Sequence, residues 1–214
     1  MSTWLAFDAG SPVTSAAVAR GGTLLAASTG ASRSGPSLLQ QIDDSLQRAT
    51  VAARELDGIV VLSGPGSFTG IRVALATALG LRAALAVPVF ALSNLAALAL
   101  HAGPGTASRF LALIDALRDE WFVQEFRFEA RGLAAEGTPE RLPASTLFAP
   151  ADARLAVHLA QTLPSHLAEL PVERVAALAS GVASAASAGT LGALLSGELA
   201  PLYLRGFTPR NARP

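Results

Sequence analysis

A short apolar run, followed by a glycine-rich loop and a long helix, constrains the fold more than any other feature of this chain. Residues 59–62 read Ile-Val-Val-Leu, a continuous apolar run that is typical of a strand buried on both faces. The loop at 64–70 comes next, and residues 71–87 then form a helix with very few polar side chains. A strand, a tight loop and a helix in this order indicate an α/β fold.

The residues before this unit predict three strands and a helix. Residues 5–28 contain three consecutive strand-like runs, and the pair Gly21-Gly22 indicates an antiparallel hairpin between the second and the third. Residues 37–50 place apolar side chains at helical spacing, with Ser34 or Ser37 as the expected cap. These elements add strands and a helix to the same sheet.

The residues after the long helix complete one lobe and begin another. A strand at 89–91 and a helix from Ser93 to about His101 finish the order β-β-β-α-β-α-β-α, a mixed sheet with helices on its faces. The glycine–proline stretch at 102–106 then indicates a boundary. The sequence therefore predicts a first lobe over residues 1–102 and a smaller α/β lobe over 107–214.

The second lobe is expected to hold less regular structure. Its predicted elements are a strand at 110–114, a hairpin partner at 121–128, a loop region at 130–152, helices at 154–161 and 173–186, and a last apolar run at 202–204.

The composition excludes several kinds of chemistry. Lysine and cysteine are absent, which rules out lysine Schiff bases, the phosphate-binding lysine of a P-loop, thiol catalysis and disulfides. The 16 basic and 16 acidic side chains cancel, so no net charge attracts nucleic acid or an anionic membrane. His101, His158 and His166 match no zinc-binding spacing. We therefore assign no metal site and no catalytic residue.

The 64–70 loop and the turn after the first strand form a candidate binding feature. Backbone N–H groups at a helix start, with hydroxyl groups beside them, bind phosphate or carboxylate. The loop does not match the P-loop, GxGxxG or GxSxG motifs, and its glycines equally fit a tight turn. The acid of the turn equally fits an Asx cap. The phosphate hypothesis names six residues: Asp8, Gly10, Ser11, Gly66, Ser67 and Thr69.

The helix over residues 71–87 is apolar almost all round, so both of its sides need to be covered. One side faces its own sheet, and the other is covered either by this chain or by a partner molecule. We expect the run to be too short and too charged for a membrane span, because Arg72 and Arg82 interrupt it. The first eight residues do not read as a signal peptide, which favours a cytoplasmic protein.

Several segments of the chain resemble the bacterial TsaB (YeaZ-type) proteins. The nonapeptide GPGSFTGIR at 64–72 is the most specific of them. The weaker matches are LAFDAGS at 5–11, LLQQID at 38–43, LIDALR at 113–118 and PLYLR at 201–205. The resemblance covers the first 118 residues well, the last 15 in part, and residues 130–195 poorly.

The resemblance implies an actin/Hsp70/sugar-kinase-like ATPase fold with two α/β lobes, the second of them reduced. It also implies a part in forming N6-threonylcarbamoyladenosine beside the anticodon of tRNAs that read codons beginning with A. In that system a TsaD-like paralogue carries out the transfer and a TsaE-like ATPase is a further partner. TsaB-type proteins act there as a non-catalytic platform, without a cofactor of their own. Any ATP or ADP with Mg²⁺ would sit at a shared interface, and tRNA would be reached through the complex.

The resemblance also implies a pairing surface on two helices of the first lobe, used for a homodimer when the chain is alone. The residues carried over are Leu38, Leu39, Ile42, Leu46, Ile71, Val73, Ala74, Leu75 and Ala78. The chain departs from the family at Arg33-Ser34-Gly35-Pro36, where a histidine and a glutamate are common. It also lacks the metal-binding histidine pair of the catalytic paralogue.

Two other functions stay open on the residues alone. A small-molecule kinase or phosphohydrolase of the same fold would use Asp8, Ser11 and the 64–70 loop to handle phosphate. A metalloprotease is disfavoured by the spacing of the three histidines.

Overall fold

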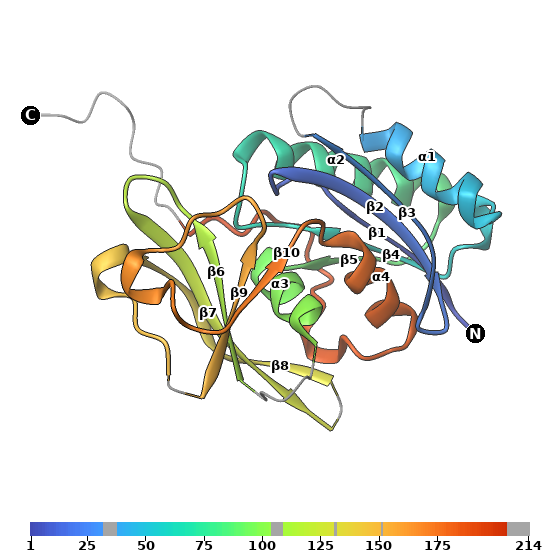
Figure 1. The fold of residues 1–214 in the computed structure, drawn as a ribbon. Coiled ribbons are helices and arrows are strands. Elements are labelled where there is room, and N and C mark those ends of the chain that lie inside the picture. Colours follow the sequence, from blue (N-terminus) through green and yellow to red (C-terminus); the bar gives the residue numbers. More distant parts are fainter. Residues whose placement is uncertain (32–37, 104–108, 131, 151, 205–214) are drawn as a thin grey trace, which may run out of the picture.

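Two five-stranded sheets form the frame of the protein (Figure 1). The computed structural model describes residues 1–31, 38–103, 109–130, 132–150 and 152–204. The strands of the first sheet are β1 (Thr3–Asp8), β2 (Val13–Arg20), β3 (Thr23–Ala31), β4 (Gly58–Leu62) and β5 (Val89–Leu92). Those of the second sheet are β6 (Arg109–Asp115), β7 (Glu120–Glu129), β8 (Gly132–Pro143), β9 (Ala153–His158) and β10 (Val172–Val175).

The second sheet repeats the topology of the first. The strand orders are β3-β2-β1-β4-β5 and β8-β7-β6-β9-β10. In each sheet, three strands form an antiparallel meander, and two more are then added in parallel beside the first strand of that meander. The expected antiparallel hairpins at the chain's start and at 110–128 are therefore confirmed.

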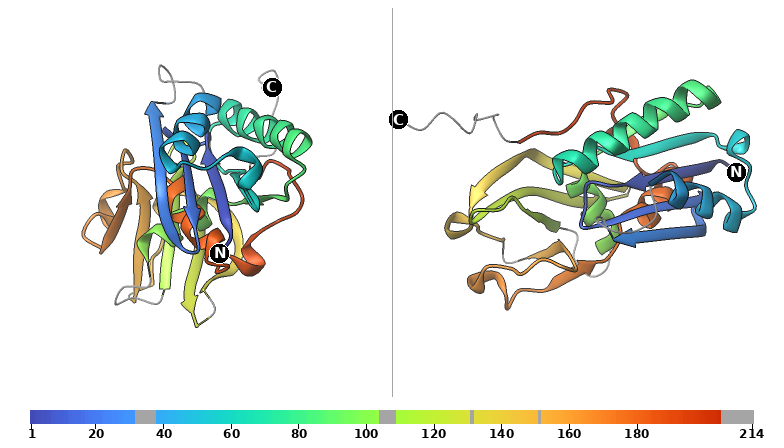
Figure 2. Two further views of the ribbon diagram at one scale, coloured as in Figure 1. Left: turned by 90° about the vertical axis from the view of Figure 1, so that its right-hand side faces the viewer. Right: turned by 90° about the horizontal axis from the view of Figure 1, so that it is seen from above.

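Four α-helices pack on the sheets of the described part. They are α1 (Leu38–Ala49), α2 (Phe68–Leu85), α3 (Asn94–Ala102) and α4 (Ala179–Ser187). Helices α1 and α2 lie on its outer face, whereas α3 and α4 lie between the two sheets (Figure 2). The alternation of strand side chains fits these layers: Leu5 and Phe7 pack in the outer core with α1 and α2, and Ala6 packs in the inner one.

The two central helices are exchanged between the lobes. Helix α3 follows β5 in the chain but packs against the second sheet, while α4 follows β10 but packs across β1, β2 and β3. One continuous apolar core therefore joins both sheets through α3 and α4. The predicted boundary between residues 102 and 107 falls between the sheets along the chain. Residues 104–106 of that stretch lie outside the described part, as do Ser34 and Ser37, the expected caps, and the departure at 33–36.

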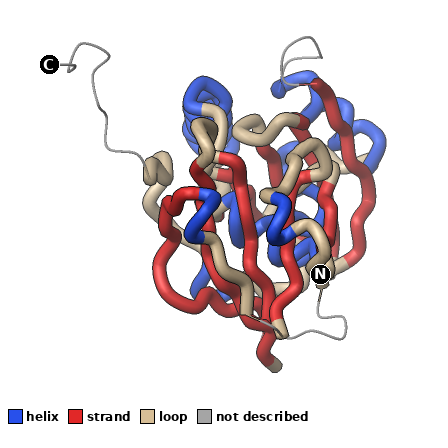
Figure 3. Tube along the Cα trace, turned by 60° about the vertical axis from the view of Figure 1, so that its left-hand side comes forward, coloured by secondary structure: helices blue, strands red, loops and turns tan. Residues whose placement is uncertain are grey.

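The second lobe is smaller because short turns replace two helices. Where the first lobe has α1 and α2, the second has the 3-10 helices η2 (Ala144–Thr146) and η3 (Ser165–Leu167) (Figure 3). Leu147 and Leu167 from these segments cover the outer face of the second sheet. The duplicated topology and the shortened connections confirm the predicted actin/Hsp70/sugar-kinase-like fold with a reduced second lobe.

Three predictions for the second half are wrong. The predicted loop at 130–152 contains the long edge strand β8, the predicted helix at 154–161 is strand β9, and the predicted helix at 173–186 is β10 followed by α4. In β9, Leu155 and Val157 face the outer core while Ala156 faces the inner one, which is strand periodicity. A short apolar run does not distinguish a buried strand from a helix, because both bury it completely.

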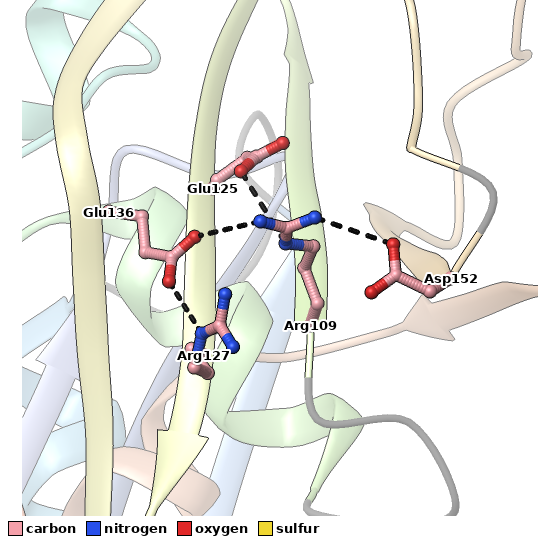
Figure 4. Close-up of polar contacts among 5 residues, drawn as sticks. All are labelled: Arg109, Glu125, Arg127, Glu136 and Asp152. Carbon is pink, nitrogen blue, oxygen red and sulfur yellow. Dashed lines mark hydrogen bonds and ion pairs between the residues drawn. The ribbon is translucent and has the colours of Figure 1, made fainter.

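A network of ion pairs links neighbouring strands at the end of the second sheet where β6 begins (Figure 4). The Arg109 guanidinium lies 3.8, 3.5 and 3.4 Å from carboxylate oxygens of three acids, namely Glu125, Glu136 and Asp152. Arg127 donates to Glu136 over 2.5 Å, and this hydrogen bond lowers the pKa of the Glu136 carboxyl. The network joins β6, β7 and β8 at the opposite end of β6 from its terminal residue, Asp115.

Candidate functional site

A cleft of about 1260 Å³ lies between the two lobes. One wall comes from residues 10–12, 65–68, 71 and 72 of the first lobe, and the other from 114–118 of the second, with His158 and Gln161 beside it. Residues 202–204 run along the cleft, where the Leu202 N–H donates to the Ser63 carbonyl over 2.8 Å. This cleft is where the loops after the parallel strands of both sheets meet, the usual position of a ligand site in α/β folds.

Asp8 ties the turn after β1 to the start of α3. Its Oδ1 accepts hydrogen bonds from the Gly10 N–H at 2.7 Å, the Ser11 N–H at 3.3 Å and the Asn94 Nδ2 at 3.3 Å. The carboxylate is completely buried and does not line the cleft. Burial raises the pKa of Asp8, and the hydrogen bonds from Ser11, Gly10 and Asn94 oppose that shift.

Asn94 completes this polar centre, which sequence reasoning missed. Its Oδ1 accepts from the Gly64 N–H at 2.7 Å, and its Nδ2 also donates to the Ser11 hydroxyl at 3.1 Å. The side chain therefore joins the ends of β1 and β4 to the end of β5, where Asn94 itself begins α3. A sequence pattern could have indicated Asn94, since polar residues follow each of the apolar strands β1, β4 and β5, and these strands end at the same sheet edge.

The glycines of the 64–70 loop allow it to pack on the turn after β1. A Cβ at Gly66 would lie 2.5 Å from the Gly10 carbonyl oxygen, and one at Gly70 would overlap the Ala9 carbonyl. The Ser67 N–H donates to the Gly10 carbonyl over 2.8 Å, and the Ser67 hydroxyl caps α2 by accepting from the Gly70 N–H over 3.3 Å.

The structure thus brings the six residues of the phosphate hypothesis to neighbouring loops without leaving a phosphate cradle. The N–H groups of Gly10, Ser11, Ser67 and Gly70 already donate within the protein. Thr69 is exposed and does not line the cleft. The tight-turn and Asx-cap interpretations describe what these residues do in the structure.

An aromatic cluster lies at the mouth of the cleft on the first lobe. The rings of Phe68 and Tyr203 stack with centroids 5.4 Å apart, and the Arg72 guanidinium lies 3.8 Å from the Phe68 ring centroid. The Arg72 Nε also donates to the Tyr203 hydroxyl over 3.2 Å. The cluster holds the 201–204 segment against the start of α2, and Phe68 keeps 51% of its surface exposed.

The opposite wall is a strained turn between β6 and β7. Asp115 ends β6 as Asp8 ends β1, and its Oδ1 accepts from the Leu117 N–H over 2.7 Å. Leu117, Arg118 and Asp119 have φ angles of 64°, 59° and 61°. A non-glycine residue in this left-handed region costs about 1–2 kcal/mol. Three in succession mark a turn that the surrounding structure holds in place.

The histidine of the cleft wall is His158. Its Nδ1 accepts from the Ala160 N–H over 3.4 Å. Burial lowers the pKa of His158, and the Ala176 backbone partly offsets this. The imidazole is therefore neutral at pH 7. Within the described ranges, no three His, Cys, Asp or Glu side chains are grouped so that they could hold a metal ion.

The structure divides the nine residues predicted for the pairing surface. Leu39 and Val73 are exposed by 59% and 47%, and Leu46 is half-buried. The other six are buried in the chain's own core and cannot contact a partner directly, which corrects their assignment: Leu38, Ile42, Ile71, Ala74, Leu75 and Ala78. They form the inner faces of α1 and α2, because a helix on a sheet turns its apolar stripe inward.

Helix α2 is longer than predicted and leaves an apolar face outside. It begins at Phe68, and by length and composition alone its 18 residues, with mean hydropathy 1.4, could cross a membrane. The expectation that it is too short and too charged is therefore wrong. This is weak evidence for a span, since soluble proteins contain such helices, and the inner face of α2 packs on the first sheet. Only 22% of those residues are buried.

Taken together, the duplicated sheets, the exchanged helices and the interlobe cleft define a two-lobed protein of the actin/Hsp70/sugar-kinase class. Residues 31–186 match the family model described as TsaD, tRNA N6-adenosine threonylcarbamoyltransferase. The chain belongs to this family, as a protein of the TsaB (YeaZ) type.

Two solved structures and a curated relative show the same relationship. An uncharacterized Pseudomonas aeruginosa protein with similarity to peptidase YeaZ is 28% identical, with a TM-score of 0.78, and the match covers 96% of this chain and 100% of that one. YeaZ from the same organism is 27% identical, with a TM-score of 0.74, and the match covers 95% of this chain and 100% of that one. The tRNA threonylcarbamoyladenosine biosynthesis protein TsaB of Haemophilus influenzae is 36% identical over 100 residues, which are 44% of this chain and 41% of that relative. The chain thus spans less than half the length of this curated relative.

Proposed function

We propose that this protein is a non-catalytic subunit of the complex that forms N6-threonylcarbamoyladenosine in tRNA. The observation that carries the proposal is the apolar surface left uncovered on α2 and at Leu39 of α1. Leu39, Val73 and Leu79 are exposed by 59%, 47% and 42%, and Gly80, next to Leu79 in the chain, is also exposed. Small and apolar side chains allow a neighbouring helix to approach closely, as in an interface between helices.

The proposed partner on this face is a TsaD-like subunit, which would supply the catalytic residues. Without it, two copies of this chain would pair through the same surface, because a C2 contact needs only one self-complementary patch. A TsaE-like ATPase and tRNA would join through the complex, and any ATP or ADP with Mg²⁺ would bind at a shared interface. This role belongs to the cytoplasm, where tRNA is modified.

The alternative, a kinase or phosphohydrolase that uses Asp8 and the 64–70 loop, has less support. The Asp8 carboxylate is buried, and N–H groups of both loops are satisfied internally. A kinase would bind ATP and Mg²⁺ by itself. We expect calorimetry on the isolated protein to show no such binding.

The experiment that tests the proposal measures mass in solution by light scattering, with the chain alone and mixed with the TsaD-like protein of the same organism. We expect a homodimer that exchanges into a heteromer. Val73→Glu should weaken both contacts by at least about tenfold, since it places a charge in an apolar interface. The matched control is Leu159→Glu, which changes a side chain 56% exposed on the second lobe.

Two results would contradict the proposal. One is a monomer that ignores the TsaD-like protein. The other is equal loss of pairing in the Val73 and Leu159 variants, which would show that the α1–α2 face is not the contact. Thermal melts of both variants establish that the fold is intact.

A further inference from the structure

We propose that the cleft between the lobes binds an organic anion that carries one carboxylate on an apolar body. The inference does not depend on the role of α1 and α2, because the exposed side chains of that face, Leu39, Val73 and Leu79, do not line the cleft. It depends on what lines the cleft, how its charges are arranged, and which groups are already engaged.

The inner surface of the cleft is apolar. Side chains from both lobes contribute to it, and they include Ile71, Leu98, Ile114, Phe122, Leu178 and Leu202. Ile114 and Leu202 keep part of their surface exposed, whereas Ile71, Leu98, Phe122 and Leu178 are buried. A concave, mostly apolar surface with a few polar groups is the usual form of a small-molecule site.

The charged side chains that line the cleft are mostly basic. They are Arg72, Arg118 and Arg141, with Asp115 as the acid among them. Asp115 is already a hydrogen-bond acceptor for the Leu117 N–H, and Arg141 pairs with Glu120. Arg118 is exposed, and no ion pair to another described residue is found for it. The arrangement leaves a guanidinium free to bind an anion at the edge of an apolar surface.

Backbone strain singles out the same residue. Arg118 is the middle one of the three left-handed residues, with φ of 59°. Such strain persists only where surrounding contacts hold it, and it is concentrated at ligand clamps and active sites. Here the Asp115 side chain and the bond from the Ala144 N–H to the Asp119 carbonyl, at 2.8 Å, hold the turn from both sides.

The cleft favours a single carboxylate over a polyphosphate. A polyphosphate needs several free backbone N–H groups, and those of Gly10, Ser11, Ser67 and Gly70 donate inside the protein. The space that a Cβ would fill at Gly66 and Gly70 is occupied by backbone of the facing turn, so the glycines leave no concavity there. One carboxylate, in contrast, needs only a guanidinium, and Arg118 provides the planar pair of donors that it prefers.

The probe that tests the proposal is decanoate, which joins a carboxylate to an unbranched apolar chain. We expect calorimetry on the full chain to show saturable binding of one decanoate per molecule. Decanol and decylammonium, which keep the chain but lose the negative charge, should bind at least about tenfold more weakly, the scale of one charge-assisted contact. Addition of ATP and Mg²⁺ should not displace decanoate.

Arg118→Gln is the variant that identifies the site, and Arg82→Gln is its matched control. Both residues are exposed, but Arg82 lies on α2 outside the cleft. We expect Arg118→Gln to weaken decanoate binding about tenfold and Arg82→Gln to leave it unchanged. A second variant, Ile114→Glu, should also weaken binding, and its melting temperature shows whether it still folds.

Four results would overturn the proposal. They are the absence of saturable binding, equal affinities for decanoate and decanol, displacement by ATP and Mg²⁺, and unchanged affinity in Arg118→Gln. Binding that Val73→Glu abolishes but Arg118→Gln leaves intact would place the probe on the outer face of α2 and would also refute the cleft as its site.

Discussion

At the scale of single residues, two glycines of α2 illustrate opposite uses of the same amino acid. Gly70 lies at the start of the helix, where a Cβ would overlap the Ala9 carbonyl, so close contact between the two loops requires the missing side chain. Gly80 lies further along the same helix, and a Cβ there would meet no atom within 4 Å. The first glycine is a packing requirement and the second is a cost to helix stability.

The first prediction compares alanine substitutions at these two positions. Gly70→Ala should lower the free energy of unfolding by about 1–3 kcal/mol or more, because the backbone of the facing turn has to move. Gly80→Ala should raise it by about 0.5–1 kcal/mol through helix propensity. Urea denaturation measures both. Equal effects of the two substitutions would show that the loops do not pack as described.

At the scale of elements, α4 begins without a cap of its own and is capped by the other lobe. Its N-cap residue, Leu178, provides no side-chain hydrogen bond. The Ala179 N–H donates instead to the Ser15 hydroxyl of β2 at 3.2 Å. The His101 Nε2, at the end of α3, lies 3.2 Å from the Gly181 N–H and 3.0 Å from the Leu178 carbonyl. The first turn of α4 is therefore completed only when the two lobes are assembled.

The second prediction concerns pH and His101. Burial lowers the pKa of His101, opposed by a bond to Leu178 and the charge of Glu173. The folded state therefore favours the neutral form of the His101 imidazole more than the unfolded state does. This contribution to stability is complete above pH 6.5, the ordinary value, and is lost as the pH falls below it.

Thermal melts from pH 8 to pH 5 measure this effect. We expect the melting temperature to fall with pH in the wild type and to fall less steeply in His101→Gln. Part of the slope should remain, because burial also lowers the pKa of His158. A slope unaffected by His101→Gln would exclude the His101 contact as its source.

At the scale of the whole molecule, the exchange of α3 and α4 makes the two lobes depend on each other. The inner face of the first sheet is covered by α4, which the chain supplies only after residue 178. The second sheet is covered on its inner side by α3, which precedes residue 103. Neither half of the chain therefore supplies the helix that covers the inner face of its own sheet.

The third prediction follows for the separated halves. A fragment of residues 1–103 should fail to fold alone, because the inner face of its sheet would be exposed to water. Mixing it with a fragment of residues 104–214 should restore the fold, and the intact chain should unfold in one transition. Circular dichroism and calorimetry measure both. A cooperative melt of the 1–103 fragment by itself would contradict this dependence.

The first lobe could be predicted well from the sequence because its signals are local. The Ile-Val-Val-Leu run of β4, the glycine loop and the helical spacing of Leu38 and Ile42 each identify one element without reference to the rest. Strand β9 reads as a helix in the sequence because its apolar run is short and buried on both sides, so the run alone shows no period. Strand β10, Val-Glu-Arg-Val, is too short to show one. The parallel pairing of β9 with β6, and of β10 with β9, supplies the missing information.

The candidate site was predicted in its loops but not in its chemistry. Asp8, Ser11 and the glycine loop were identified from strand ends and spacing, whereas Asn94 and Arg118 gained their importance only from residues distant in the chain. The burial of six of the nine residues predicted for the pairing surface has the same cause, since helical spacing marks an apolar stripe without stating what covers it.

The sequence by itself determined the order of elements in the first lobe, the lack of lysine and cysteine chemistry, and the family to which the chain belongs. These depend on neighbouring residues, whose effects act along the chain. Only the tertiary structure decided which N–H groups of the loops are engaged, which faces of α1 and α2 stay exposed, and which lobe each central helix covers. Burial and hydrogen bonding join groups that are far apart in sequence, so they are settled only when the whole chain has packed.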